Sequence, residues 1–186
     1  MRPLATLPLS SPFFITWFLA SAALAQDGFA LTSPVIDPGG SLPADLKCTR
    51  DGGDGLSPPL AWSDTPEGTR SIAVSMHHYP RGTLEGVDTP SHYWLLWNLP
   101  ATTSTLERGN PGSIGDEGAD KDMRGVGYTP PCSPPGPAHE YIITVYALDA
   151  KPTALPSVDD PTVDWQQMML ALDGHVLASS DLRFTN

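Results

Sequence analysis

The sequence predicts a single loop-rich β domain with one helix near its C-terminus. The chain has 186 residues, including 21 prolines and 17 glycines. Both residue types interrupt helices and mark turns. The strongest local pattern, at residues 141–148, is rich in the β-branched and aromatic side chains that strands favour. A content of 40% hydrophobic and 17% charged residues suits one globular core.

The strands are expected in segments separated by turn-forming residues. Residues 37–59 are dense in glycine, proline, aspartate and serine and are expected to be loops, whereas residues 100–127 read as a long polar surface excursion. The segment 93–99 is apolar on both faces, which is typical of a central strand covered on both sides. The expected strands and short apolar pieces are residues 29–33, 60–62, 71–76, 93–99 and 141–148.

One helix is expected near the C-terminus. Asp160 and Pro161 form an N-cap followed by a proline in the first turn. The apolar residues of one helical face then follow: Met168, Met169, Leu172 and Val176. Gly174 interrupts this pattern and is where one helix would end and another short one begin.

The formal net charge of −11 disfavours some partners. A strongly acidic surface repels nucleic acid and anionic lipid headgroups. We therefore expect no nucleic-acid binding. Any site for an anion has to be a local pocket of hydrogen-bond donors.

The N-terminus has the features of an export signal. Arg2 precedes the apolar run 13–20, and Ala23-Leu24-Ala25 supplies a small-x-small pattern. We predict a signal peptide at residues 1–25, a domain at 26–186, a periplasmic or secreted location, and no stable membrane insertion after cleavage. The alternative is an uncleaved anchor, although the run is short for a membrane span.

Two cysteines, Cys48 and Cys132, complete the inventory. An exported chain meets an oxidising compartment, so one disulfide is an open prediction. Two free buried thiols are the alternative, because sequence does not show the geometry that a bridge requires.

Six blocks of the chain carry a family resemblance through their composition and order. They are Leu31-Thr32-Ser33-Pro34, the stretch from Cys48 to Trp62, the stretch from Pro66 to Ser71, the strand ending in Asn98-Leu99-Pro100, the stretch from Gly127 to Gly136 with His139-Glu140-Tyr141 and Val145 to Leu148, and Gly174 to Ala178. Together they resemble the phosphatidylethanolamine-binding protein family, in its bacterial Raf-kinase-inhibitor-like branch. The resemblance implies a mainly β fold with two antiparallel sheets in a sandwich-like arrangement, a C-terminal helix, and a small cavity for phosphate-like anions.

The same resemblance places candidate ligand residues. The loop with Cys132, Ser133 and Pro134 occupies the family's ligand-loop position, where backbone N–H groups can converge on an anion. A rigid surface turn is the alternative. His139 matches a family histidine, and Tyr141 lies two residues further along a strand, so both face the same way.

Two departures from the family pattern alter the expected site. Where family members usually carry aspartates, His78 and Met76 stand here, which exchanges acidic groups for imidazole and brings ammonium recognition into question. The family's next histidine corresponds to Tyr93, with His92 one residue earlier. Either Tyr93 fills that place, or a β-bulge brings His92 into the pocket.

We therefore predict a non-enzymatic module that binds a small anion, such as a phospho-headgroup or a carboxylate, without a cofactor. Modulation of a protein partner is a second expected role. Alternatives are a protease or hydrolase inhibitor and a hydrolase using Cys132 near His139. A further alternative is a metal site, since imidazole is a common metal ligand; its candidate residues are His77, His78, His92 and His139. Phe184 is expected to form a wall of the pocket.

Overall fold

The structure is a computed structural model that describes residues 28–110, 113–134 and 136–186. The expected signal peptide therefore lies outside the described residues. Three short strands form one antiparallel sheet in the order β1-β2-β5: β1 (Ala30–Thr32), β2 (Leu60–Ser63) and β5 (Thr105–Leu106). Five strands form the second, in the order β6-β4-β3-β7-β8: β3 (Ser71–His78), β4 (Ser91–Pro100), β6 (Asp116–Glu117), β7 (Glu140–Leu148) and β8 (Val176–Thr185).

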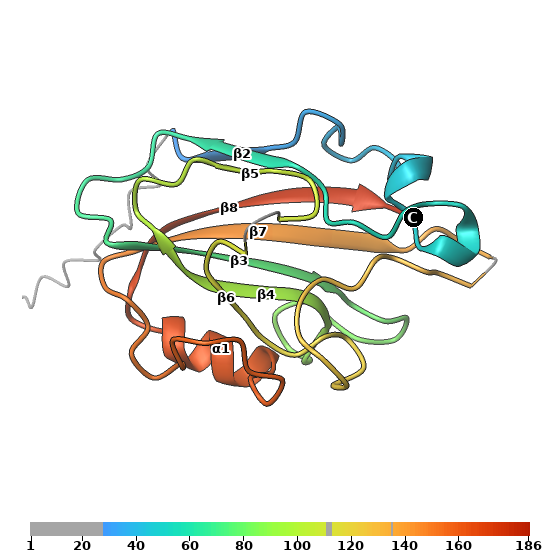
Figure 1. The fold of residues 1–186 in the computed structure, drawn as a ribbon. Helices are drawn as coiled ribbons and strands as arrows, with labels where there is room; N and C mark the ends of the chain where they lie inside the picture. The colour runs from blue at the N-terminus through green and yellow to red at the C-terminus, as the bar shows by residue number, and fades with distance from the viewer. Residues whose placement is uncertain (1–27, 111–112, 135) are drawn as a thin grey trace, which may run out of the picture.

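The elements stack in three layers, with the five-stranded sheet in the middle (Figure 1). The small sheet covers one face, and the helix α1 (Trp165–Leu172) covers the other. Every residue of β3 is buried, because alternate side chains enter the two cores. Val74 packs toward the small sheet with Trp62, whereas Ala73 packs toward α1 with Met168. The prediction of a mainly β fold with two antiparallel sheets and a C-terminal helix is confirmed.

The central strands agree with the expected segments, and β4 adds two irregularities. Its pairing with β3 shifts register between the pairs Ile72–Leu99 and Val74–Leu96, and again between Met76–Trp94 and His77–His92. Each shift places one extra residue on β4, as in a β-bulge. The second shift makes Tyr93 the extra residue.

The segment 100–127 is less exposed than its composition indicates. Leu106, in β5, is buried in the core beneath the small sheet, and Ala119 is fully buried. β6 pairs with the edge of β4 through Leu96–Glu117 and Trp97–Asp116. Single apolar residues within polar sequence give no periodic signal, so this contribution to the sheets was not predictable from pattern.

The C-terminal helix begins later than the sequence indicated. Its N-cap is Asp164, not Asp160, and Asp160 instead accepts bonds from Thr162 in the preceding turn. Met168 and Leu172 are buried as expected. In the described ranges, no helix is long and apolar enough to cross a membrane.

The segment after Gly174 is a strand, so the expectation of a second short helix with Val176 on its apolar face is wrong. Gly174 has a left-handed φ of 75°, which ends the helix. β8 then pairs with β7 from Val176 to Thr185. It is an edge strand with polar residues on its outer face, and these residues obscure the alternation of apolar and polar side chains by which a strand is recognised in sequence.

The helix cap gives a first testable prediction. Asp164 accepts a bond from the backbone N–H of Gln167, and the Gln167 side chain accepts one from the Asp164 N–H. Asp164→Ala should lower the free energy of unfolding by about 1 kcal/mol. Asp164→Asn, which can still cap, should cost at most half as much. Denaturant midpoints at unchanged slope measure both, and equal losses in the two variants would contradict the capping role.

Candidate functional site

The candidate site lies where β3 ends and β7 begins, beside the end of β8 (Figure 1). A cavity of about 150 Å³ opens there. Its walls come from the end of β3, the loop that follows it, and the segment before β7. The lining residues are His78, Tyr79, Arg81, Pro137, Ala138, His139 and Glu140.

Two histidines form a hydrogen-bonded pair in this cavity. The Nδ1 atom of His78 lies 2.8 Å from the backbone oxygen of Glu140, and its Nε2 atom lies 3.3 Å from Nδ1 of His139. A carbonyl oxygen only accepts hydrogen bonds, so Nδ1 of His78 carries a proton and donates. When both rings are neutral, Nε2 of His78 is then the acceptor and Nδ1 of His139 the donor.

This assignment determines what the pair offers to a ligand. In the neutral pair both N–H groups are used internally, and Nε2 of His139 is an acceptor that would repel an anion. One additional proton leaves Nε2 of His139 with an N–H group, whichever ring carries the charge. Burial lowers the pKa of His78; the hydrogen bond to the Glu140 oxygen opposes this shift, and the charges of His139 and Lys121 add to it. Burial thus favours the neutral form of His78.

Aromatic rings pack behind the histidine pair, outside the lining of the cavity. Tyr141 is buried and stacks on His78, with ring centroids 5.1 Å apart. Phe184 stacks on Tyr141 with ring centroids 5.6 Å apart and is fully buried. It lies behind Tyr141 and does not line the cavity, so it is not the pocket wall that was expected. The Tyr141 hydroxyl lies 3.1 Å from the Ser133 hydroxyl, which joins this aromatic cluster to the expected ligand loop.

A disulfide anchors the expected ligand loop, residues 132–134, to the segment that contains Cys48. Cys48 and Cys132 are bridged, with Cα atoms 5.3 Å apart, which settles the open prediction in favour of the bridge. The Cys48 backbone N–H bonds to the Pro131 oxygen, and Arg50 donates to the Ser133 oxygen at 2.7 Å. Pro134 is exposed at the outer end. The bridge removes Cys132 as a free thiol, so the hydrolase alternative loses its nucleophile.

The bulge in β4 decides between Tyr93 and His92. Tyr93 lies on the small-sheet face beside Tyr141, at a centroid distance of 5.1 Å, and burial raises its pKa. His92 pairs with His77 on the helix face, and its Nε2 donates to the Asp120 oxygen at 3.1 Å. The bulge is present, but it keeps Tyr93 rather than His92 on the site's side. Placing His92 among the ligand residues is not supported by this geometry.

The alternative metal site also loses its geometry. His78 and His139 lie on the small-sheet face, whereas His77 and His92 lie on the helix face, so the four histidines do not converge. Among the described residues, the one cluster with metal-ligand spacing is Cys48, Asp51 and Cys132. Both of its sulfurs are in the disulfide.

The comparisons with known proteins identify the family. The family model described as "Phosphatidylethanolamine-binding protein" matches residues 32–186. The chain belongs to the phosphatidylethanolamine-binding protein family. The UPF0098 protein of Chlamydia muridarum is 31% identical over 163 residues, 83% of this chain and 96% of the relative. Escherichia coli YbcL is 31% identical over 152 residues, 77% of this chain and 79% of the relative.

Solved structures of phosphatidylethanolamine-binding protein homologues have the same fold. A homologue from Chlamydia trachomatis superposes with a TM-score of 0.71 at 29% identity, covering 86% of this chain and 97% of that one. Escherichia coli YbcL, described as a new member of the mammalian family, gives a TM-score of 0.71 at 24% identity, covering 85% and 97%. The second likeness concerns the fold alone.

Within this phosphatidylethanolamine-binding protein fold, one cationic group lines the cavity and a second lies close enough to act on His78. Arg81 lines it, and the ammonium of Lys121 lies 5.8 Å from the centre of the Tyr93 ring. The one lining carboxylate, Glu140, pairs with Arg183 at 3.0 Å. The charge at the cavity thus opposes the charge of the whole chain. Arg81 lies in the loop after β3, which carries no recognisable motif, so sequence reasoning missed it.

Asn186 is a second residue that sequence reasoning missed. Its backbone exchanges two 2.9 Å hydrogen bonds with His139, and its side-chain nitrogen donates to Ser133 at 3.3 Å. Its Oδ1 atom is buried without a hydrogen-bond partner among the described residues. A residue after the last strand gives no motif signal; only the β7–β8 pairing brings it here.

Proposed function

We propose that this protein is a binding module whose cavity at His78 and His139 takes up a small anion, a phospho-headgroup or a carboxylate. The observation that carries the proposal is the hydrogen-bonded histidine pair open to a cavity that Arg81 also lines. Imidazolium and guanidinium groups form charge-assisted bonds with phosphate and carboxylate. The nearby Ser133 and Tyr141 hydroxyls extend the set of polar groups.

The donor and acceptor arrangement of the histidine pair makes anion binding depend on pH. Since the neutral pair offers the anion no donor, ligand uptake should be coupled to uptake of one proton. Affinity should therefore rise as pH falls, by up to about tenfold per pH unit at pH above the pKa of the free pair. Sulfate is the suitable probe, because it does not titrate in this range.

The experiment is a sulfate titration followed by NMR at pH 7.5 and pH 5.5. Saturable shifts are expected at His139, Tyr141 and Ser133, with the dissociation constant lower by about tenfold or more at pH 5.5. His139→Ala should abolish the site shifts. The control is His175→Ala, because His175 is exposed and bonds to Asp149 away from the cavity. Absence of saturable shifts at both pH values would contradict the proposal.

The substitution His78→Asp tests ligand preference separately. It restores the acidic group that the family resemblance implies at this position. A carboxylate beside His139 should weaken sulfate binding several-fold, because like charges repel. Phosphoethanolamine should then bind better than inorganic phosphate, whereas the wild-type protein should show no such preference. An unchanged ranking in the variant would show that position 78 does not select the ligand.

We also propose that the protein is exported and acts as a binder rather than as an enzyme. Its disulfide is typical of oxidising compartments, which supports a periplasmic or secreted location. If the protein also modulates a partner protein, we propose that it does so through the same cavity. Cell fractionation with mass determination of the processed N-terminus tests export. A protein retained whole in the cytoplasm would contradict it.

A further inference from the structure

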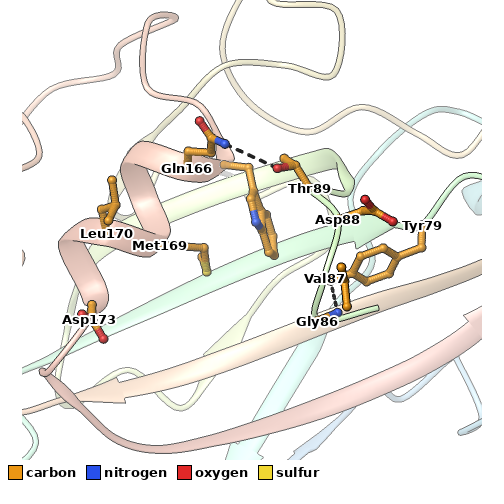
Figure 2. A pocket seen from close by; sticks show the side chains of 10 residues that line it. Tyr79, Gly86, Val87, Asp88, Thr89, Gln166, Met169, Leu170 and Asp173 are labelled. Carbon is orange, nitrogen blue, oxygen red and sulfur yellow. Dashed lines mark hydrogen bonds between the residues drawn. The ribbon is translucent and has the colours of Figure 1, made fainter. Parts of the chain in front are cut away.

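A second and larger cavity lies on the opposite face of the five-stranded sheet. It is a groove of about 590 Å³ between the 79–90 loop and α1 (Figure 2). That volume is within the range of small-molecule sites. Its lining residues are Tyr79, Gly86, Val87, Asp88, Thr89, Trp165, Gln166, Met169, Leu170 and Asp173.

Aromatic and apolar side chains form the interior of this groove. The Trp165 ring lies 4.6 Å and the Tyr79 ring 5.5 Å from the same buried imidazole, that of His77. Gly86 donates its backbone N–H to the Tyr79 hydroxyl at 3.4 Å, and Figure 2 shows this contact holding the ring against the loop. Two aromatic faces are thus fixed in position, and such faces attract cations.

Carboxylates stand at the two sides of the groove. Figure 2 shows Asp173 at the end of α1 and Asp88 on the facing loop. No arginine, lysine or histidine is among the lining residues. Within the described part of the chain, neither carboxylate forms an ion pair. The C-terminal end of the helix, which precedes Asp173, adds partial negative charge.

The residues around the groove leave its interior without positive charge and leave its mouth open to solvent. His77 has a pKa lowered to about 4, chiefly by burial, so the imidazole beneath the two rings is neutral at neutral pH. Val87 and Leu170 are each 76% exposed, which leaves apolar surface open at the mouth. At one end Gln166 bonds to Thr89 at 3.4 Å and joins the helix to the loop.

We propose that this groove is a second binding site, for a small organic ammonium ion carried on an apolar chain. The aromatic rings and carboxylates bind the ammonium, and Val87, Met169 and Leu170 contact the chain. The net charge of −11 attracts such a ligand, as it repels the anion of the first cavity. The two cavities share one lining residue, Tyr79, but the proposal does not depend on anion binding, because Trp165, Asp88 and Asp173 line this groove alone.

The test is an NMR titration of the whole protein with hexyltrimethylammonium. Saturable shifts are expected at the Trp165 indole N–H and the Met169 methyl group. 1-Hexanol, a neutral chain of equal length, and hexane-1-sulfonate should bind at least roughly tenfold more weakly, because they lack the cation. Affinity for the ammonium should fall as salt is raised, since the carboxylates are exposed.

Charge variants complete the test. Replacing both carboxylates, by Asp88→Asn and Asp173→Asn, should weaken hexyltrimethylammonium binding by roughly five- to tenfold. Glu67→Gln, which removes an exposed acid outside the groove, should change it less than about twofold. Equal binding of 1-hexanol, unchanged affinity in the double variant, or shifts that avoid Trp165 would each overturn the proposal.

Discussion

Replacing both bridged cysteines, Cys48→Ser with Cys132→Ser, should lower the free energy of unfolding by about 4–5 kcal/mol. The two residues are 84 positions apart. A cross-link over a loop of that length restricts the unfolded chain, and the chain-entropy relation gives a value of this size. Few other single changes approach half of a small domain's total stability of about 5–15 kcal/mol.

Denaturant unfolding of the oxidised protein, the reduced protein and the double serine variant measures this effect. The reduced protein and the variant should agree with each other and differ from the oxidised form by the expected amount. Loss of the bridge should also weaken sulfate binding, because the bridge fixes the loop that carries Ser133. A variant within about 1 kcal/mol of the oxidised protein would show that the bridge is structurally dispensable.

The second large effect is a pH dependence of stability that arises at His77. The side chain is 6% exposed, and its Nδ1 atom has no hydrogen-bond partner among the described residues. Burial lowers its pKa from 6.5 to about 4; Asp181 and Glu85 oppose this shift, and Arg183 and His78 add to it. The folded state therefore binds a proton at His77 less readily than the unfolded state does.

The sign of the effect follows from that difference. Well above pH 6.5 the His77 side chain is neutral in both the folded and the unfolded state and does not lower the free energy of unfolding. As pH falls from 6.5 toward 4, the unfolded state takes up the proton first, and the free energy of unfolding declines. The full loss, reached below about pH 4, is about 3 kcal/mol.

A His77→Phe variant isolates this contribution. Phenylalanine keeps an aromatic ring beside those of Tyr79 and Trp165 and has no group to protonate. The stability difference between variant and wild type should shift in the variant's favour by about 3 kcal/mol between pH 7.5 and pH 4. Because the pKa values of His78 and His92 are also lowered, the variant will still lose stability in acid. A pH-independent difference would contradict the assignment to His77.

The fold was largely predictable because its central strands carry strong local signals. Residues 141–148 are rich in β-branched and aromatic residues, residues 93–99 are rich in leucine and aromatic residues, and both segments are buried strands. The predicted start of the C-terminal helix was wrong because Asp160 and Asp164 are both residues that can cap a helix. Gln167, three residues after Asp164, completes a capping box with that residue and so marks the actual start. The edge strand β8 was not predicted because polar residues on its outer face obscure the alternating pattern of a strand.

The candidate site was predictable where residues share a strand or a recognisable loop. His139, Tyr141 and Ser133 come together as expected, with His78 beside them. The choice between Tyr93 and His92 depended on a one-residue bulge, which no sequence pattern specifies. Arg81, Lys121 and Asn186 enter through loops and strand pairing from distant segments, so only the folded chain shows them near the cavity.

The most direct test of the central claim is nitrogen NMR of the His139 imidazole, with and without saturating sulfate at pH 7. We expect free His139 to have a bare Nε2 and a protonated Nδ1, and sulfate to add a proton at Nε2 with uptake of about one proton per bound anion. A sulfate-bound protein whose His139 keeps a bare Nε2, or sulfate binding without proton uptake, would contradict the account of an anion site assembled by the histidine pair.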